Sequence, residues 1–485
     1  MITRRDFLNN TTAAAVALSL PVRAVAQATP QTSLTVATRI LEVKGRSATV
    51  LGITDDSGKS GLILAQNEPF DLRVTNTLNE PTVIHWHGLT PPFQYDGSNV
   101  SQDPIQSGGT HDYRFDLTRG GTNWMHSHFG LQEASLLAAP LILQSAEDLA
   151  ADRQDVTIIL HDFSFTPPTE ILARLQSVAM SHVGSGMAAM NMGMVRTGQG
   201  SMAGMDYGAI DMSGQMNMDL NDVAFDAFLA NDRDLSDPEI VPVDGNSAVR
   251  LRVINAASSS NFWIDMGQLS GRLIAVDGMN VAPIFGSRFE IAMAQRLDID
   301  VNIPAGGGAF PVLAQLEGGK ARTGVIMASV SAAIAQIPSE AELIAPPVLL
   351  DLERQLLGSE GLAPRAADLS VALDLTGDMS SYQWGINGRT FAEREPVQIT
   401  LGQRVEITLR NQTMMSHPMH LHGHHFQVVG LGRARLIGAM RDTVLIPAME
   451  SVTIAFDADN PGEWPLHCHN MYHMAAGMMT TLKYT

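Results

Sequence analysis

The chain is poor in cysteine, poor in basic residues relative to acidic ones, and without a long apolar run. Its one cysteine, Cys468, cannot form a disulfide within the 485-residue chain. The 31 basic and 50 acidic residues give a formal net charge of −19, which argues against nucleic acid as a partner and suits a soluble protein that attracts cations. The apolar segment at residues 11–20 is too short for a permanent membrane span.

The N-terminal segment has the features of an export signal rather than of folded structure. The run TRRDFL at residues 3–8 is a twin-arginine motif, the apolar segment after it is rich in alanine, and AVA at residues 24–26 offers a cleavage site. An ordinary N-terminus is the alternative. We predict that residues 1–28 are a twin-arginine signal peptide and that the protein is exported to a bacterial periplasm.

Short β-type runs separated by glycine, proline, asparagine and aspartate fill the rest of the chain. Examples lie at residues 36–41, 249–254 and 405–409, and few stretches show the 3.6-residue period of an amphipathic helix. This pattern predicts an all-β fold of Greek-key sandwiches. A mature length of roughly 455 residues fits about three domains. We place them at residues 29–146, 147–340 and 341–485, with a methionine-rich insert at residues 180–218 in the second.

The surroundings of Cys468 indicate a metal ligand. The residue lies in His467-Cys468-His469, with His473 five residues after the cysteine and Met478 five residues after that. A thiolate, two imidazoles and a weak thioether are the donors of a blue copper electron-transfer site. In a strand, neighbouring side chains point to opposite faces, so Cys468 would face one metal and the flanking histidines a second centre. Covalent bonds would then connect the two centres.

Three further histidine clusters supply ligands for the second centre. They are His85-Trp86-His87, His126-Ser127-His128 and His417-Pro418-Met419-His420-Leu421-His422. Each His-x-His pair places two imidazoles on one face of a strand. A polar surface strand explains any single pair equally well, but four pairs, one of them around the only cysteine, favour a metal site. Imidazole and thiolate donors suit copper, zinc or iron, and the combination of histidine, cysteine and methionine selects copper.

An internal repeat accounts for the spacing of these clusters. Asn76 and Asn411 each end a β-type run and are followed nine residues later by a His-x-His-Gly motif, whereas Asn255 is followed at the same distance by Ile264. We therefore predict three similar units, of which the outer two carry ligands that must meet across an interface. The middle unit should hold no metal, because the positions that match ligands elsewhere are Ile264, Met266 and Leu313.

In this order, the four clusters resemble the copper signatures of the multicopper oxidases, which include bacterial laccases, copper-efflux oxidases and fungal laccases. The match covers essentially the whole mature chain, and its motifs are very specific. The resemblance implies three consecutive cupredoxin-like domains and four coppers per chain. The implied ligands are His417, Cys468, His473 and axial Met478 for a type 1 copper, His85 and His420 for a type 2 copper, and His87, His126, His128, His422, His467 and His469 for a type 3 pair.

The resemblance also implies a mechanism. Single electrons enter near His473 and pass through Cys468 and its histidine neighbours, and dioxygen takes four of them and leaves as water. Asp96 resembles a family aspartate that assists proton supply, with a plain Asp-Gly turn as the alternative. Residues 470–472 lack the acidic residue that many members carry there, so a second proton source stays open. Met478 implies a lower type 1 potential than leucine or phenylalanine would give.

The insert at residues 180–218 contains ten of the 26 methionines. Thioethers are soft ligands that prefer Cu(I), and the segment resembles the methionine-rich inserts of copper-efflux oxidases. The alternative is a flexible lid or an amphipathic helix with methionine on one face. The candidate Cu(I)-capture residues are Met187, Met190, Met192, Met194, Met202, Met205, Met212, Met216 and Met218.

Several functions are compatible with these observations. The leading hypothesis is a monomeric periplasmic oxidase that uses dioxygen to oxidise Cu(I), phenols or similar donors in copper tolerance. Asp442 resembles a family element near the type 1 edge and is a candidate substrate contact, with a structural Arg-Asp pair as the alternative. A second hypothesis is a copper-sequestering protein with incidental oxidase activity. A third is a copper nitrite reductase, but those enzymes do not pair type 3 coppers through a His-Cys-His motif.

Overall fold

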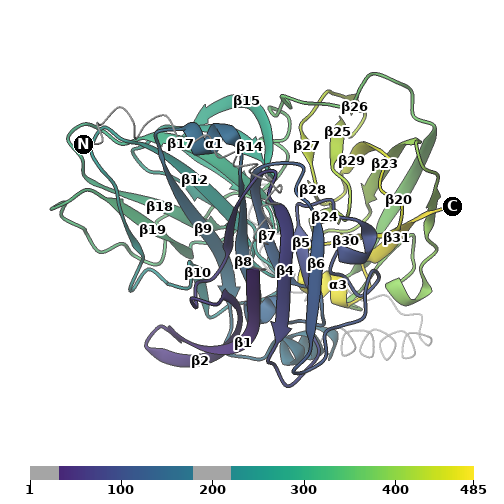
Figure 1. Ribbon diagram of the computed structural model, residues 1–485, viewed down its shortest axis with the longest axis horizontal. Coiled ribbons are helices and arrows are strands. Elements are labelled where there is room, and N and C mark those ends of the chain that lie inside the picture. The colour runs from purple at the N-terminus through teal and green to yellow at the C-terminus, as the bar shows by residue number, and fades with distance from the viewer. Residues whose placement is uncertain (1–31, 178–219) are drawn as a thin grey trace, which may run out of the picture. The chain divides into compact units, whose positions relative to one another are not determined.

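Three sandwiches of two β-sheets each follow one another along the chain (Figure 1). The structure, a computed structural model, describes residues 32–177 and 220–485. The predicted all-β fold of three consecutive cupredoxin-like sandwiches is therefore confirmed. The predicted signal peptide and the whole methionine-rich insert lie outside the described residues.

The first sandwich has one sheet in the order β2–β1–β4–β6 and a second in the order β3–β8–β7–β5. Its strands are β1 (Thr32–Val43), β2 (Arg46–Asp55), β3 (Leu62–Ala65), β4 (Pro69–Asn76), β5 (Ile84–His87), β6 (Thr110–Asp116), β7 (Gly121–Ser127) and β8 (Ala138–Gln144). In β4 every second residue is buried, because the strand turns Phe70, Leu72 and Val74 toward the core that Trp86 and Met125 of the other sheet complete. This alternation fixes which face of the sheet is apolar.

The second sandwich has sheets in the orders β10–β9–β12–β17–β14–β15 and β11–β19–β18–β13–β16. Its strands are β9 (Gln154–Phe163), β10 (Ala227–Ala230), β11 (Ile240–Pro242), β12 (Ala248–Asn255), β13 (Phe262–Asp265), β14 (Gly271–Val276), β15 (Met279–Gly286), β16 (Arg288–Ile291), β17 (Arg296–Asn302), β18 (Ala309–Leu316) and β19 (Arg322–Ala328). Ile264 and Met266, which match ligand positions of the outer units, pack in the apolar core of this sandwich.

The third sandwich has sheets in the orders β21–β20–β23–β29–β25–β26, with β27 also paired to β25, and β22–β31–β30–β24–β28. Its strands are β20 (Leu369–Asp378), β21 (Gln383–Ile386), β22 (Val397–Ile399), β23 (Arg404–Asn411), β24 (His417–Leu421), β25 (Phe426–Leu431), β26 (Ala434–Arg435), β27 (Met440–Arg441), β28 (Thr443–Ile446), β29 (Ser451–Asp457), β30 (Glu463–Cys468) and β31 (Met479–Tyr484). Its apolar core also takes in Ile171 and Leu350 from outside these strands.

Helices contribute little to the described residues. They comprise the α-helices α1 (Ala146–Ala150) and α3 (Met471–Ala475), helical residues 168–177, and the 3₁₀ turns η1 (Phe93–Tyr95), η2 (Glu133–Ser135) and η3 (Phe391–Glu393). None of the helices described between residues 32 and 485 has the length and apolar character needed to cross a bilayer. The exact domain boundaries given above stay predictions.

The repeated asparagine has the same structural role in each sandwich. Asn76, Asn255 and Asn411 end the strands β4, β12 and β23, and all three are buried. Each side-chain amide donates to a carbonyl oxygen of the loop that follows, and each side-chain oxygen accepts a backbone N–H two residues on. A buried polar group must be satisfied in this way, so the asparagine fixes the path into the strand that carries the histidines.

Candidate metal centres

The histidine pairs predicted as ligands meet where the first and third sandwiches face each other. Strand β5 carries His85 and His87 and pairs with β7, and strand β24 pairs with β30 so that His420 lies opposite His467. All ten histidines of the four clusters are buried, with at most 6% of any side chain exposed. Ten imidazoles gathered in the interior cannot be a polar surface pattern, and burying them requires partners.

The first group comprises His417, Cys468 and His473. The two Nδ1 atoms lie 3.1 Å apart, and Cys468 Sγ lies 3.6 Å from His417 Nδ1 and 3.8 Å from His473 Nδ1. A tetrahedral metal with ordinary bond lengths holds two nitrogens roughly 3.3 Å apart and a nitrogen and a thiolate sulfur roughly 3.5 Å apart. Met478 is fully buried, and its carbonyl accepts the backbone N–H of Cys468. The group therefore fits a small soft cation.

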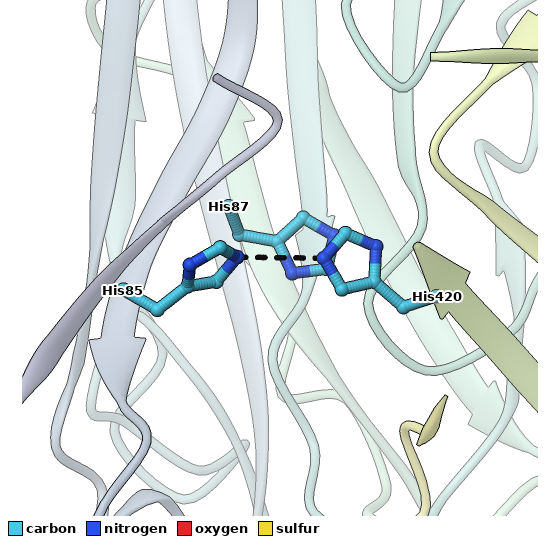
Figure 2. Close-up of side chains that lie close together, drawn as sticks. All are labelled: His85, His87 and His420. Carbon is cyan, nitrogen blue, oxygen red and sulfur yellow. Dashed lines mark hydrogen bonds between the residues drawn. The ribbon is translucent and has the colours of Figure 1, made fainter. Parts of the chain in front are cut away.

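The second assembly comprises eight histidines in smaller groups. His85 Nε2 and His420 Nε2 lie 3.4 Å apart, with the His87 ring stacked on that of His420 (Figure 2). His467 Nε2 lies 3.3 Å from His128 Nε2 and 3.1 Å from His422 Nε2. A third group has one ring nitrogen from each member within 4.8 Å of the others, and its members are His87, His126 and His469.

Unpartnered nitrogen atoms support metal binding in the third group. His87 Nδ1, His126 Nε2 and both ring nitrogens of His469 are buried without a hydrogen-bond partner. Burial is the largest cause that lowers the pKa of His87, His126 and His469, with repulsion from neighbouring histidines adding to it. The imidazoles are therefore neutral and present lone pairs, which is the state that binds a transition metal.

Cys468 has a matching electrostatic requirement. Burial raises the pKa of its thiol, so a thiolate forms here only beside a cation. The histidines on either side of it belong to the second assembly, while Cys468 itself belongs to the first. Neighbouring side chains of this strand therefore point to different centres, as the sequence predicted. The structure brings all eleven predicted histidine and cysteine ligands into these groups.

Asp96 lies against the second assembly, as its predicted role in proton supply requires. Its side chain is fully buried, its Oδ2 accepts from His422 Nδ1 at 2.9 Å, and its main-chain oxygen accepts from His85 Nδ1 at 2.8 Å. These two bonds leave the Nε2 atoms of both histidines free to face the centre. The Asp96 carboxyl therefore lies directly beside the second assembly.

Glu133 is a second buried carboxyl at the site, and sequence analysis missed it. Its Oε2 lies 2.6 Å from His126 Nδ1 and its Oε1 lies 3.7 Å from His469 Nδ1. Burial raises the pKa of Glu133 well above its usual range, with repulsion from Asp162 adding to the shift. The residue follows the second His-x-His cluster by five positions in a short 3₁₀ turn, a location that carries no periodic signal.

Asp442 does not lie where the resemblance placed it. The prediction assigned it to the type 1 edge, but Oδ1 accepts from His87 Nε2 at 3.1 Å, on the side of the second assembly. The carboxyl is also 2% exposed, so a substrate cannot reach it. Strand β27 pairs only with β25 before the chain enters β28 beside β24, and this turn carries Asp442 to the histidines instead of to the surface.

The outer edge of His473 is covered by a residue that sequence analysis also missed. Asp222 Oδ2 lies 2.6 Å from His473 Nε2 and accepts a hydrogen bond of 2.7 Å from the Tyr382 hydroxyl. Burial alone would raise the pKa of Asp222, but the attraction of His473 and the two hydrogen bonds outweigh it and lower the pKa. The described chain resumes at residue 220, so Asp222 immediately follows the methionine-rich insert. The candidate Cu(I)-capture methionines lie outside the described residues.

A cavity of about 470 Å³ leads toward the second assembly. Its walls come from the first and third sandwiches and include His128. The lining residues are Asn99, Val100, His128, Gly130, Phe391, Arg394, Glu463, Met474 and Met479. A small molecule can thus approach one histidine of the assembly without entering the first group, where His417 and His473 are fully buried.

Comparison with known proteins identifies the family. Models described as multicopper oxidase match residues 35–148, 191–334 and 364–485. The multicopper oxidase MmcO of Mycobacterium tuberculosis is 31% identical over 424 residues, which cover 85% of this chain and 78% of that protein. Copper resistance protein A of Escherichia coli is 26% identical, with 99% of this chain and 98% of the relative covered.

A solved structure agrees with the fold. Fet3p, described as a multicopper oxidase that functions in iron import, superposes with a TM-score of 0.75 at 18% identity, covering 93% of this chain and 90% of that chain. At this identity the likeness supports the fold alone. Family models across three segments, a relative above 30% identity and buried histidine groups that fit copper lead to one conclusion. This chain belongs to the multicopper oxidase family.

Proposed function

We propose that this protein couples the one-electron oxidation of Cu(I), or of small phenolic or aromatic donors, to the four-electron reduction of dioxygen to water. One observation supports this most directly. Cys468 belongs to one candidate centre, and its neighbours in the chain, His467 and His469, belong to the other. A pathway of a few covalent bonds then joins a site for single electrons to a site with room for several metals.

The proposed copper assignment follows the groups in the structure. A type 1 copper would be held by His417, Cys468 and His473 with axial Met478, a type 2 copper by His85 and His420, and a type 3 pair by His87, His126, His469, His128, His422 and His467. This gives four coppers per chain. When bound, each copper would supply reversible one-electron chemistry, and the four coppers together would allow dioxygen to be reduced without release of partly reduced oxygen.

The protein side chains orient and insulate the proposed centres. Asp96 fixes the ring orientation of His422 and offers a carboxyl from which protons can reach the site. Buried packing around His417 and Cys468 excludes water from the type 1 position. The cavity beside His128 offers dioxygen a way in and water a way out. Dioxygen and the electron donor therefore need not compete for one entrance.

A physiological role in copper tolerance is supported by the relatives and by charge. Two of the similar proteins carry the name copper resistance protein A, and the net charge of −19 favours a cationic donor. We propose export to the periplasm by the twin-arginine route and function as a monomer. The methionine-rich insert would capture Cu(I), and the buried carboxylate of Asp222 beside His473 suits a positively charged donor.

The experiment is oxygen uptake by the copper-loaded protein with Cu(I) and with a simple phenol. It is repeated after deletion of residues 180–218, and again in a variant in which the nine candidate methionines are replaced by leucine. The leucine variant is the matched control, because it keeps length and apolar character but removes the soft thioether ligands. Retained blue colour verifies that the type 1 position is intact in each variant.

A selective loss of Cu(I) oxidation in both variants, with phenol oxidation kept or increased, supports a cuprous oxidase. If both activities change alike, the insert acts as a lid or structural element, and a laccase-like role with an organic donor is the better assignment. If copper binds without any oxygen uptake, the second function, copper sequestration, replaces the oxidase.

A further inference from the structure

Two arginine–aspartate pairs cross the boundary between the second and third sandwiches. Arg296, the first residue of β17, donates from Nη1 and Nη2 to the two carboxylate oxygens of Asp442 at 2.7 and 2.5 Å. In the opposite direction, Arg441 donates to Asp277 at 2.9 Å and to Glu353 at 2.5 Å. All five side chains are buried, with at most 5% exposed. Residues 441 and 442 are neighbours, and Asp277 Oδ1 also lies 3.7 Å from Arg296 Nη1, so the two pairs belong to one buried network.

Only one of these two pairs reaches a candidate copper ligand. Asp442 Oδ1 accepts from His87 Nε2 at 3.1 Å and from the Thr443 hydroxyl at 2.9 Å. An ionised carboxylate can only accept, so the proton of the neutral His87 ring must be on Nε2. The lone pair is then on Nδ1, the buried and unpartnered nitrogen. It is therefore the atom that His87 can offer to the group it forms with His126 and His469.

Arg296 is held rigidly enough to direct this bond. Its Nε donates to the Thr122 carbonyl at 3.1 Å, and its Nη1 also donates to the Ala294 carbonyl at 3.1 Å. A Cβ at Gly88 would lie 2.2 Å from Asn123 Oδ1 and 2.7 Å from Arg296 Nη2. Gly88 has a φ of +96°, so both its conformation and this close approach require glycine. The glycine of the H-W-H-G motif thus accommodates Asn123 of the first sandwich and Arg296 of the middle one.

We propose that Arg296, a residue of the middle sandwich, is a positioning residue of the trinuclear copper centre. This centre consists of the proposed type 2 copper and type 3 pair. Arg296 orients Asp442, which orients His87 so that Nδ1 faces the metal. The middle sandwich thereby acts on a site whose proposed ligands all come from the outer two. This inference rests on the copper assignment proposed above. Arg441 pairs with Asp277 and Glu353 and has no hydrogen bond to a proposed ligand, so it serves as the comparison.

The test compares Arg296→Lys with Arg441→Lys. Each substitution keeps the charge but loses the planar fork that a carboxylate accepts, so each weakens one buried interdomain pair to a similar extent. Copper-loaded proteins are dialysed against a chelator. Retained copper per chain, the EPR-visible fraction of that copper and the visible absorption of the type 1 site are then measured. Arg296→Gln, which keeps one donor group, is the second variant if the lysine variant does not fold.

We expect Arg296→Lys to lose copper from the trinuclear centre about 10–100-fold more readily than the parent, as is usual when a partner behind a metal ligand is removed. Its EPR-visible fraction should rise because the type 3 pair is disturbed, while the blue absorption is unchanged. Arg441→Lys should match the parent in all three. Equal copper retention and equal EPR spectra in the two variants would overturn the proposal. A parent protein without any EPR-silent copper would instead refute the copper assignment itself.

Discussion

At the scale of single residues, Cys468 determines how the two candidate centres are connected. It is buried among His417, His473 and Met478, and its thiol does not ionise without a cation beside it. Removing the sulfur should therefore remove the thiolate-to-copper absorption and leave the histidine groups on the other face of the strand intact.

We accordingly expect Cys468→Ser to abolish the blue absorption near about 600 nm while the EPR signal of type 2 copper persists. Serine has nearly the same volume, so the variant should fold. Visible and EPR spectra of the copper-loaded variant check this. Retained blue absorption would show that the type 1 copper lies elsewhere.

A second prediction concerns Asp96. Its carboxyl lies 2.9 Å from His422 Nδ1, and an asparagine keeps the acceptor oxygen but cannot exchange a proton. We expect Asp96→Asn to lower kcat for oxygen reduction by about 10²–10⁴-fold, the usual contribution of a positioned acid or base, without loss of blue colour. Asp116→Asn, at an exposed position of the same sandwich, is the control and should behave as the parent. A normal kcat in Asp96→Asn would remove the residue from proton transfer.

Most histidines and the cysteine could be recognised as candidate ligands from the chain, because they lie in His-x-His pairs spaced by the strand period. Their division into copper types was implied only by the family resemblance. Glu133, Asp222 and Arg296 could not be recognised, because their roles exist only after distant segments have packed together. Asp442 also shows that a residue's place in the fold cannot be predicted from its local motif. Its motif was noticed, but only the fold places it beside His87 and away from the surface.

At the scale of single elements, the short helix α3 positions His473. Asn470 caps the helix, accepting from the backbone N–H of Tyr472 at 3.1 Å and of His473 at 3.3 Å. Its amide donates to Ser259 of the middle sandwich at 2.9 Å. These contacts show that Asn470 links the helix to the middle sandwich. The side chain is used to hold the helix, and the buried carboxyl on that side of the site is Glu133.

We expect Asn470→Ala to destabilise the protein by about 0.5–2 kcal/mol, the usual cost of removing a helix N-cap, and to shift the blue absorption because His473 moves with the helix. Ser145→Ala, which removes the N-cap of α1, is the matched control, because the Ser145 hydroxyl bonds to Asp148 and to no proposed ligand. The control should lower the unfolding temperature but leave the visible spectrum unchanged. The idea fails if both variants have the spectrum of the parent.

The repeat also shows how far elements can be predicted from this chain. The three asparagines mark equivalent strand ends, and the structure confirms equivalent strand pairing around them, with β1–β4, β9–β12 and β20–β23 all parallel. The order of strands across each sheet was not predictable, because it depends on hydrogen bonds between segments that have no local sequence signal.

At the scale of the whole molecule, buried carboxyl groups hold the segment that leads from the second sandwich to the third. Glu317 accepts from Asn261 Nδ2 at 2.7 Å and from the backbone N–H of Val348 at 2.6 Å. Burial raises its pKa to about 7, although these two bonds oppose the shift. The folded protein therefore binds this proton more tightly than the unfolded chain does.

A pH dependence of stability follows from this difference. The contribution of Glu317 is fully present below its unfolded pKa of 4.5 and is lost as the pH rises through about 7. We expect the stability of the parent relative to Glu317→Gln to decrease over this range by up to about 3 kcal/mol, at about 1.4 kcal/mol per pH unit. Urea unfolding of both proteins at pH 5 and pH 8 measures it, with all other titrating groups cancelling in the comparison. A difference that does not change with pH would contradict it.

The central claim is that Cys468 and its flanking histidines join a one-electron site to a centre that reduces dioxygen completely. The most direct measurement is the stoichiometry of turnover by the copper-loaded protein with a one-electron donor, together with an assay for hydrogen peroxide. The account predicts that about four donor molecules are oxidised for each dioxygen consumed and that peroxide does not accumulate. About two donors per dioxygen, with peroxide released, would contradict it.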